Sequence, residues 1–172
     1  MDQGILIARL VIGLVMAAHG AQKAFGWFGG YGLSGTGMFF EKLGFRPGKM
    51  FAAAASYGEL ISGLLIALGF LGPIGPALML SVMIVAAISV HWENGLFATK
   101  NGIEVPLLYA VFAVAIALTG PGSFSLDEVS GLTWLSSPSI AWTALFAGVI
   151  GAAGNLAVRR REIATPDVAP QQ

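Results

Sequence analysis

The chain has 172 residues, of which 56% are hydrophobic and 10% are charged, and its formal net charge at pH 7 is zero. Soluble domains contain about 25% charged residues, so this composition indicates a polytopic membrane protein, and it offers no basic surface for nucleic acid. The sequence has no cysteine, which excludes thiol–disulfide exchange, thiolate metal ligation and cysteine nucleophilic catalysis by these residues alone.

Five apolar segments follow one another along the chain, each near the roughly 20 residues that a helix needs to cross a hydrocarbon core. They cover residues 4–24, 50–71, 73–96, 103–119 and 138–158. We expect all of them to be helical, because a spanning segment must satisfy its own backbone polar groups. Turn residues separate them at Gly72-Pro73 and at residues 120–122, and Ser137-Pro138 suits the first turn of the last helix.

The loop between the first two segments is rich in aromatic residues and glycine from residue 25 to residue 32. After it, Thr36 is a suitable N-cap for a short amphipathic helix over residues 36–44. We expect this helix to lie in the plane of the membrane interface, with the aromatic residues anchoring it at the headgroups.

The basic residues outside the apolar segments fall on alternate connections. If all five segments span, eight of them lie on one side and none on the other: Lys23, Lys42, Arg46, Lys49, Lys100, Arg159, Arg160 and Arg161. The positive-inside rule then predicts an external N-terminus and a cytoplasmic C-terminus.

Several spaced motifs follow one another along the first 127 residues. They comprise Arg9 with the run HGAQKAFGWFGG at residues 19–30, ELISGLL at residues 59–65, and His91 with GLF at residues 95–97. They continue with GIEVPLLY at residues 102–109 and GPGSFSLD at residues 120–127. In this order they resemble the DoxX family of small integral membrane proteins, and the resemblance covers residues 5–127.

The resemblance implies an all-α fold, since the family is usually a four-helix membrane bundle. We therefore expect a DoxX-like core with four spans over residues 1–127, followed by a fifth C-terminal transmembrane helix within residues 128–161. Residues 162–172 contain two prolines and end in two glutamines, which favours a disordered tail.

The functional implications of the resemblance are broader. The family is linked to quinone-coupled thiosulfate oxidation, to redox-defence complexes and to thiol maturation. It implies an accessory or anchoring subunit of a redox-linked complex in a prokaryotic plasma membrane, in contact with lipid and with other subunits or further copies of itself. Whether the chain is catalytic stays open. A small transporter or proton relay and a purely structural assembly subunit are the alternatives.

Ionisable residues inside the apolar segments point to an internal polar site, since a charge at bilayer depth costs about 2.5–3.5 kcal/mol unless it is paired or faces a cavity. Glu59 lies in the middle of the second segment, where we expect it to pair with Arg9, Lys23 or a histidine. The predicted pocket, for a ligand or a proton relay, comprises Arg9, His19, Gln22, Lys23, Glu59, His91 and Glu104. The competing interpretation is a buried ion pair that only holds helices in register.

No cofactor is certain from these residues, and quinone is a candidate because the pocket's side chains can hydrogen-bond a quinone carbonyl. Haem is disfavoured, since His19 and His91 lie toward one membrane edge beside charged partners. No metal-ligand spacing occurs. In the fifth segment, Ala144, Gly148 and Ala152 form a stripe of small residues, which favours close helix packing. We expect that stripe to contact a partner or a second copy rather than the core.

Overall fold

The computed structural model describes residues 2–160, which form helices joined by turns, with no strand in that range. This confirms the all-α prediction. Four helices are long and apolar enough to cross a membrane: α1 (Asp2–Phe25), α3 (Gly48–Leu68), the continuous run Ile74–Asn94 and α7 (Pro138–Ala157). The third of these comprises α4 (Ile74–Ala86), a π-helical turn η2 (Ala87–His91) and a 3₁₀ turn η3 (Trp92–Asn94).

The remaining elements are shorter. They are η1 (Trp27–Gly29), α2 (Gly32–Lys42), η4 (Ala98–Lys100), α5 (Glu104–Thr119), α6 (Leu126–Val129) and η5 (Thr133–Ser136). The predicted tail at residues 162–172 lies outside the described residues, as does Arg161.

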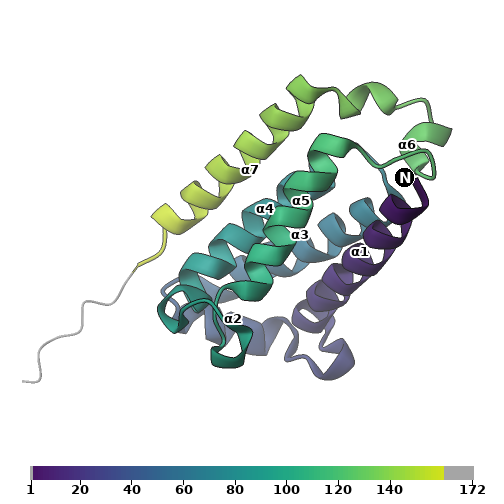
Figure 1. The fold of residues 1–172 in the computed structure, drawn as a ribbon. Helices are drawn as coiled ribbons and strands as arrows, with labels where there is room; N and C mark the ends of the chain where they lie inside the picture. The colour runs from purple at the N-terminus through teal and green to yellow at the C-terminus, as the bar shows by residue number, and fades with distance from the viewer. Residues whose placement is uncertain (1, 161–172) are drawn as a thin grey trace, which may run out of the picture.

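The fourth predicted span, at residues 103–119, corresponds to a shorter helix, α5. α5 has 16 residues, which at 1.5 Å per residue gives about 24 Å against a hydrocarbon core of about 30 Å. It nevertheless runs the length of the bundle beside α4, and the start of α1 and the end of α7 lie at opposite ends of the molecule (Figure 1). The chain therefore passes along the bundle five times.

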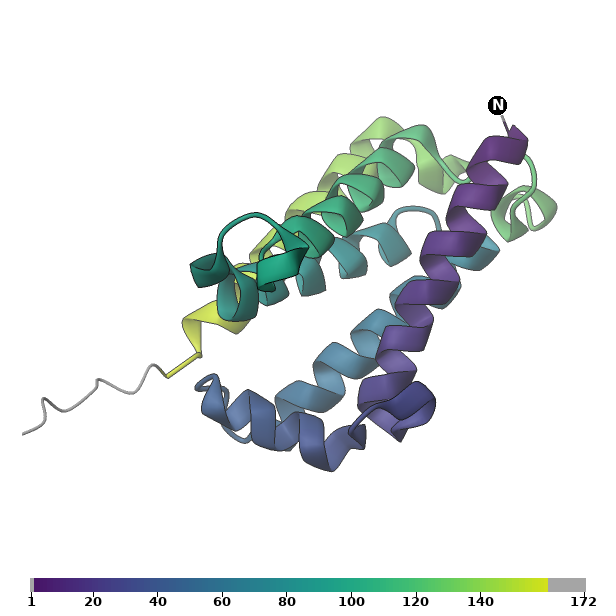
Figure 2. The ribbon, with the colours of Figure 1, turned by 60° about the horizontal axis from the view of Figure 1, so that its bottom comes forward.

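The helices form two groups. α1 and α2 pack on α3, while α5 and α7 pack on α4, and α3 contacts α4 between them. Figure 2 shows the two groups on either side of the molecule. The apolar core between them lies mainly on α1, α3, α4, α5 and α7 and comprises Met16, Ile66, Met79, Leu80, Met83, Ala113, Ala117 and Leu145.

The small-residue stripe of α7 packs against the core and not against a partner, so that expectation was wrong. A Cβ on Gly148 would lie 2.5 Å from the carbonyl oxygen of Ala77 in α4, and Ala152 is fully buried. The small side chains let the two backbones approach closely, which makes α7 an integral part of this bundle.

The amphipathic helix begins earlier than expected. α2 starts at Gly32, and Thr36 lies inside it instead of capping it. The Thr36 hydroxyl donates to the carbonyl oxygen of Lys23 at 3.3 Å, near the end of α1, where backbone carbonyls lack partners within the helix. The Thr36 hydroxyl therefore bonds to the backbone of α1 and does not cap its own helix.

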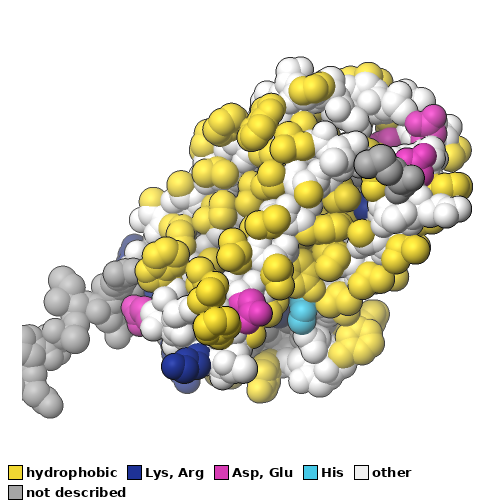
Figure 3. Space-filling model, viewed as in Figure 1, with side chains coloured by type: hydrophobic (Ala, Val, Ile, Leu, Met, Phe, Trp, Pro, Cys, Tyr) yellow, Lys and Arg dark blue, Asp and Glu magenta, His cyan; other side chains and the backbone are white. Residues whose placement is uncertain are grey.

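Large apolar side chains cover much of the outer surface between the two ends of the bundle (Figure 3). On α1 alone, Ile7, Val11 and Leu14 are each more than half exposed. Contiguous exposed apolar surface of this kind is costly in water and ordinary in lipid.

Candidate functional site

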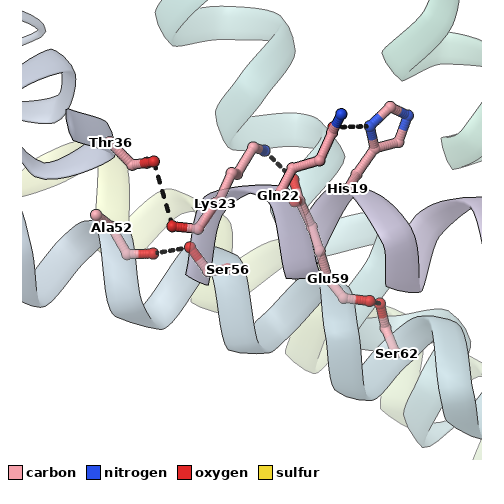
Figure 4. A network of polar contacts seen from close by, with 8 residues as sticks. All are labelled: His19, Gln22, Lys23, Thr36, Ala52, Ser56, Glu59 and Ser62. Atoms are coloured by element: carbon pink, nitrogen blue, oxygen red, sulfur yellow. Dashed lines mark hydrogen bonds and ion pairs between the residues drawn. The ribbon is translucent and has the colours of Figure 1, made fainter. Parts of the chain in front are cut away.

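The centre of the site is an ion pair between Lys23, near the end of α1, and Glu59, in the middle of α3. Figure 4 shows the lysine Nζ donating to Oε1 of the carboxylate. The Glu59 side chain is 2% exposed and that of Lys23 is 36% exposed. The carboxylate is therefore enclosed by the bundle, while the ammonium group reaches it from a more open position.

Close packing of two helices brings this pair together. A Cβ on Gly20 would lie 2.5 Å from the Leu60 nitrogen and 2.6 Å from the Ser56 oxygen. Because only a glycine fits there, α1 approaches α3 closely one turn before Lys23. The lysine therefore meets the carboxylate directly, as one of the partners expected from the sequence.

Buried hydroxyl groups surround the carboxylate on α3 without bonding to it. Ser56 Oγ donates to the carbonyl oxygen of Ala52 at 2.6 Å, and Ser62 Oγ donates to that of Glu59 at 3.1 Å (Figure 4). Both hydroxyls are satisfied by the helix itself, so Lys23 is the side chain that neutralises Glu59.

The larger of two cavities beside the pair has a volume of about 340 Å³. Lys23 and Glu59 form its polar wall, and most of the remaining wall is apolar. Its other polar lining residues are Thr36, Ser81, Ser89, His91 and Asn155, from α2, α4, η2 and α7. This combination of an apolar wall with a few polar groups is typical of small-molecule sites.

The smaller cavity, of about 280 Å³, lies on the side of α1 and α5. It shares Lys23, Glu59 and His91 with the larger cavity and adds His19 and Tyr109. The rings of His19 and Tyr109 meet edge to face, with centroids 6.4 Å apart. The ion pair thus borders both cavities.

Two residues that line the larger cavity each have a buried polar atom without a hydrogen-bond partner: Oε2 of Glu59 and Oγ of Ser89. An unpartnered buried polar atom costs about 1–3 kcal/mol, so each favours a ligand or water that supplies the missing bond. Ser89 belongs to η2, and π-helical turns of this kind are frequent at functional sites.

Arg9 does not join this site. It lies near the opposite end of the bundle, fully buried, and its Nη2 donates to the carbonyl oxygen of Phe124 at 2.6 Å. Asp127 is also fully buried there and accepts from the backbone of Leu71 at 2.9 Å and of Gly72 at 2.6 Å. The two residues form a closed corner, in which Arg9 joins α1 to the segment before α6 and Asp127 joins the α3–α4 turn to α6 itself.

Gln22 and Glu104 line neither cavity. The side-chain oxygen of Gln22 lies 3.2 Å from His19 Nδ1, and its side-chain nitrogen donates to the carbonyl oxygen of Phe28 at 3.2 Å. Glu104 accepts from the backbone nitrogen of Ala98 at 2.7 Å, within the loop before α5. Both stabilise turns around the site and line neither cavity, although the predicted pocket included them.

The structure therefore brings together four of the seven predicted residues, namely His19, Lys23, Glu59 and His91. His91 is held by a 2.8 Å contact between its Nδ1 and the carbonyl oxygen of Asn101. Sequence reasoning missed Thr36, Ser89, Tyr109 and Asn155 as lining residues. The signal that could have identified these residues was a polar side chain within an apolar helix.

Within residues 2–160, no group of three or more histidine or acidic side chains is arranged to hold a metal ion. A family model, DoxX, matches residues 4–92, which contain α1 to η2 and the Lys23–Glu59 pair. The match ends before α5, so the prediction of a core up to residue 127 remains untested. No curated protein and no solved structure matches the chain.

Proposed function

Because this chain belongs to the DoxX family of integral membrane proteins, we propose that it is a membrane subunit that binds a lipophilic ligand beside the Lys23–Glu59 pair. Its role in this proposal is to present the ligand to a redox-linked complex. The observation that supports it best is the buried carboxylate with one unpartnered oxygen at the wall of an apolar cavity.

The size and lining of the cavity favour a lipophilic ring. Its volume of about 340 Å³ lies at the small end of the roughly 300–1,000 Å³ usual for ligand pockets. Phe39, Phe40 and Phe51 contribute aromatic surface to its wall. A ligand of this class can enter sideways from the lipid instead of from water.

The polar groups suit a quinone in both oxidation states. The Lys23 ammonium group and the Ser89 hydroxyl can donate to a quinone carbonyl, while Oε2 of Glu59 can accept from the hydroxyl of a hydroquinone. Lysine and carboxylate together therefore offer hydrogen bonds to the oxidised and the reduced head alike.

The accessory role follows from the chemistry that the chain lacks. With no cysteine in the sequence, thiol steps of the kind associated with the family would have to take place on a partner. Such a partner would be another subunit in the same membrane.

Binding of a short-tailed benzoquinone to the purified protein tests the proposal. Glu59→Gln removes the charge and one acceptor oxygen, and should weaken binding about tenfold or more, which corresponds to about 1.4 kcal/mol. Glu104→Gln is the matched control, because this carboxylate lines neither cavity, and it should bind as the wild type does. Equal affinity in both variants would contradict the proposal.

A proton relay is the second candidate, favoured by the convergence of His19, His91 and Tyr109 on the cavity that also holds the ion pair. Histidine changes its charge near neutral pH, so such a cluster can pass protons along a cavity. Reconstituted vesicles with a pH gradient distinguish the candidates. Proton flux that Glu59→Gln abolishes supports the relay, and its absence in the wild type rules the relay out.

We also propose that the end of the bundle with the α2–α3 loop and the end of α7 faces the cytoplasm of a prokaryotic cell. Lys42, Arg46, Arg159 and Arg160 gather there, as the positive-inside rule requires. Reporter fusions after residue 172 and within residues 130–136 should report opposite sides, with the first inside. An external report after residue 172 would reverse the orientation.

A further inference from the structure

A recess of about 630 Å³ opens on the surface where the α2–α3 loop meets the ends of η3 and α7. Four basic side chains line it, against two carboxylates: Lys42, Arg46, Arg159 and Arg160, with Glu41 and Glu93. Basic side chains are visible at this end of the molecule in Figure 3. The recess does not include Lys23 or Glu59, so it is separate from the site described above.

The basic wall on the α7 side is held in place by contacts with the loop. Arg159 Nε donates to the carbonyl oxygen of Leu43 at 2.6 Å, and its guanidinium carbon lies 5.9 Å from the centre of the Phe45 ring. The backbone nitrogen of Arg160 donates to Gly44 at 2.9 Å. These bonds use one guanidinium nitrogen of Arg159 and no side-chain nitrogen of Arg160.

One of the two carboxylates is already engaged. Glu41 accepts a hydrogen bond from the backbone nitrogen of Gly48 at 3.2 Å, and the four basic side chains still outnumber the two carboxylates. The recess therefore favours an anion, and arginine beside lysine is a combination suited to phosphate oxygens.

The position of the recess indicates where the phosphate would come from. It lies at the ends of membrane-length helices, next to Met38 and Phe39 of α2, which are 64% and 46% exposed. Basic pockets between helices at the cytoplasmic surface bind lipid headgroups. We propose that this recess binds the phosphodiester headgroup of an anionic membrane lipid, with its acyl chains along the apolar side of α2.

A bound headgroup would join two distant parts of the chain. Lys42 belongs to α2 and Arg160 follows α7, so one phosphate between them ties the last helix to the α2–α3 loop. Anionic lipid should therefore stabilise the folded protein more than zwitterionic lipid does.

Thermal unfolding of the full chain in nanodiscs tests this proposal. Nanodiscs of phosphatidylcholine alone are compared with nanodiscs that also contain phosphatidylglycerol. Lys42→Gln/Arg160→Gln is the test variant, because both side chains are exposed and the anchoring contacts of Arg159 stay intact. Arg160→Gln alone is compared with Lys100→Gln, which removes one equal charge outside the recess.

We expect phosphatidylglycerol to raise the Tm of the wild type and of Lys100→Gln by about 3 °C or more, as binding to the folded state alone requires. Arg160→Gln should lose part of that increase, and the double variant more than half. An equal increase in the wild type and the double variant overturns the site. An equal increase from inorganic phosphate in phosphatidylcholine nanodiscs overturns the lipid and assigns the recess to a soluble anion.

Discussion

Within residues 2–160, charged side chains are buried in two places, and the two differ in the space around the charged groups. At the Arg9–Asp127 corner both side chains are fully buried, and both carboxylate oxygens of Asp127 accept backbone hydrogen bonds. At the Lys23–Glu59 site one carboxylate oxygen has no partner, and two cavities border the pair.

Unpartnered atoms alone do not separate the two places, because Nε and Nη1 of Arg9 also lack partners. The room around the charged groups distinguishes the two places. A cavity of about 240 Å³ lies near the corner, yet Asp127 lines it and Arg9 does not. Gly69 adds to the enclosure, since a side chain there would collide with the Arg9 guanidinium group. The corner is therefore a structural fastening, that is, a contact that only holds segments of the chain together. The Lys23–Glu59 site instead retains both a free acceptor and room for a ligand.

The largest effect on stability should come from Asp127→Ala. It leaves the Leu71 and Gly72 nitrogens without acceptors and removes a buried negative charge that acts on Arg9. A hydrogen bond to a charged group contributes about 1.5–3 kcal/mol, so the loss of two should cost about 3 kcal/mol or more. Denaturant unfolding in detergent measures this loss. A cost below about 1 kcal/mol would show that the corner is not a fastening.

Gly148→Leu should give the next largest effect. The new side chain would collide with the Ala77 backbone and push α7 from α4, and overpacking of this kind costs about 1–3 kcal/mol. Gly154→Leu is its control, because a Cβ at Gly154 meets nothing within 4 Å. Equal unfolding free energies for the two variants would mean that α7 is not packed as described.

Gly20→Ala should have a smaller effect on stability and a specific effect on the site. A single methyl group separates α1 from α3 next to the Lys23–Glu59 pair, at a cost of about 1 kcal/mol or somewhat more. Quinone affinity should fall as well, because the lysine moves from the carboxylate. Gly4→Ala, on the same helix with open space around it, should change neither. Loss of quinone affinity in both variants would show that the α1–α3 contact at Gly20 does not determine binding at the site.

Hydropathy was enough to predict the helices and most of their ends. The segment predicted at residues 138–158 is α7 at Pro138–Ala157, and the one at residues 103–119 is α5 at Glu104–Thr119. These ends could be predicted because Pro138 and Gly120 mark helix boundaries by backbone chemistry alone. A buried carboxylate at Glu59 could be predicted from composition alone, since Glu59 is the single acidic or basic residue in its segment, residues 50–71.

The partner of each charge could not be predicted. Arg9 and Lys23 lie on the same helix, and the sequence allowed either to reach Glu59. The choice depends on how α1 slides and rotates against α3, and helices that are apolar on all sides give little periodic signal for that. Ser89 was missed because its position depends on a π-helical turn, and the packing of α7 was misjudged because small residues suit a core contact as well as a partner.

The most direct measurement compares unfolding free energy and quinone affinity in Lys23→Met/Glu59→Leu. Replacing a buried pair with apolar side chains of similar size is often neutral or stabilising. A ligand site therefore predicts that the double variant unfolds within about 1 kcal/mol of the wild type while quinone binding is lost. A variant that is strongly destabilised, yet still binds quinone with wild-type affinity when folded, would show that the pair is a fastening like the Arg9–Asp127 corner.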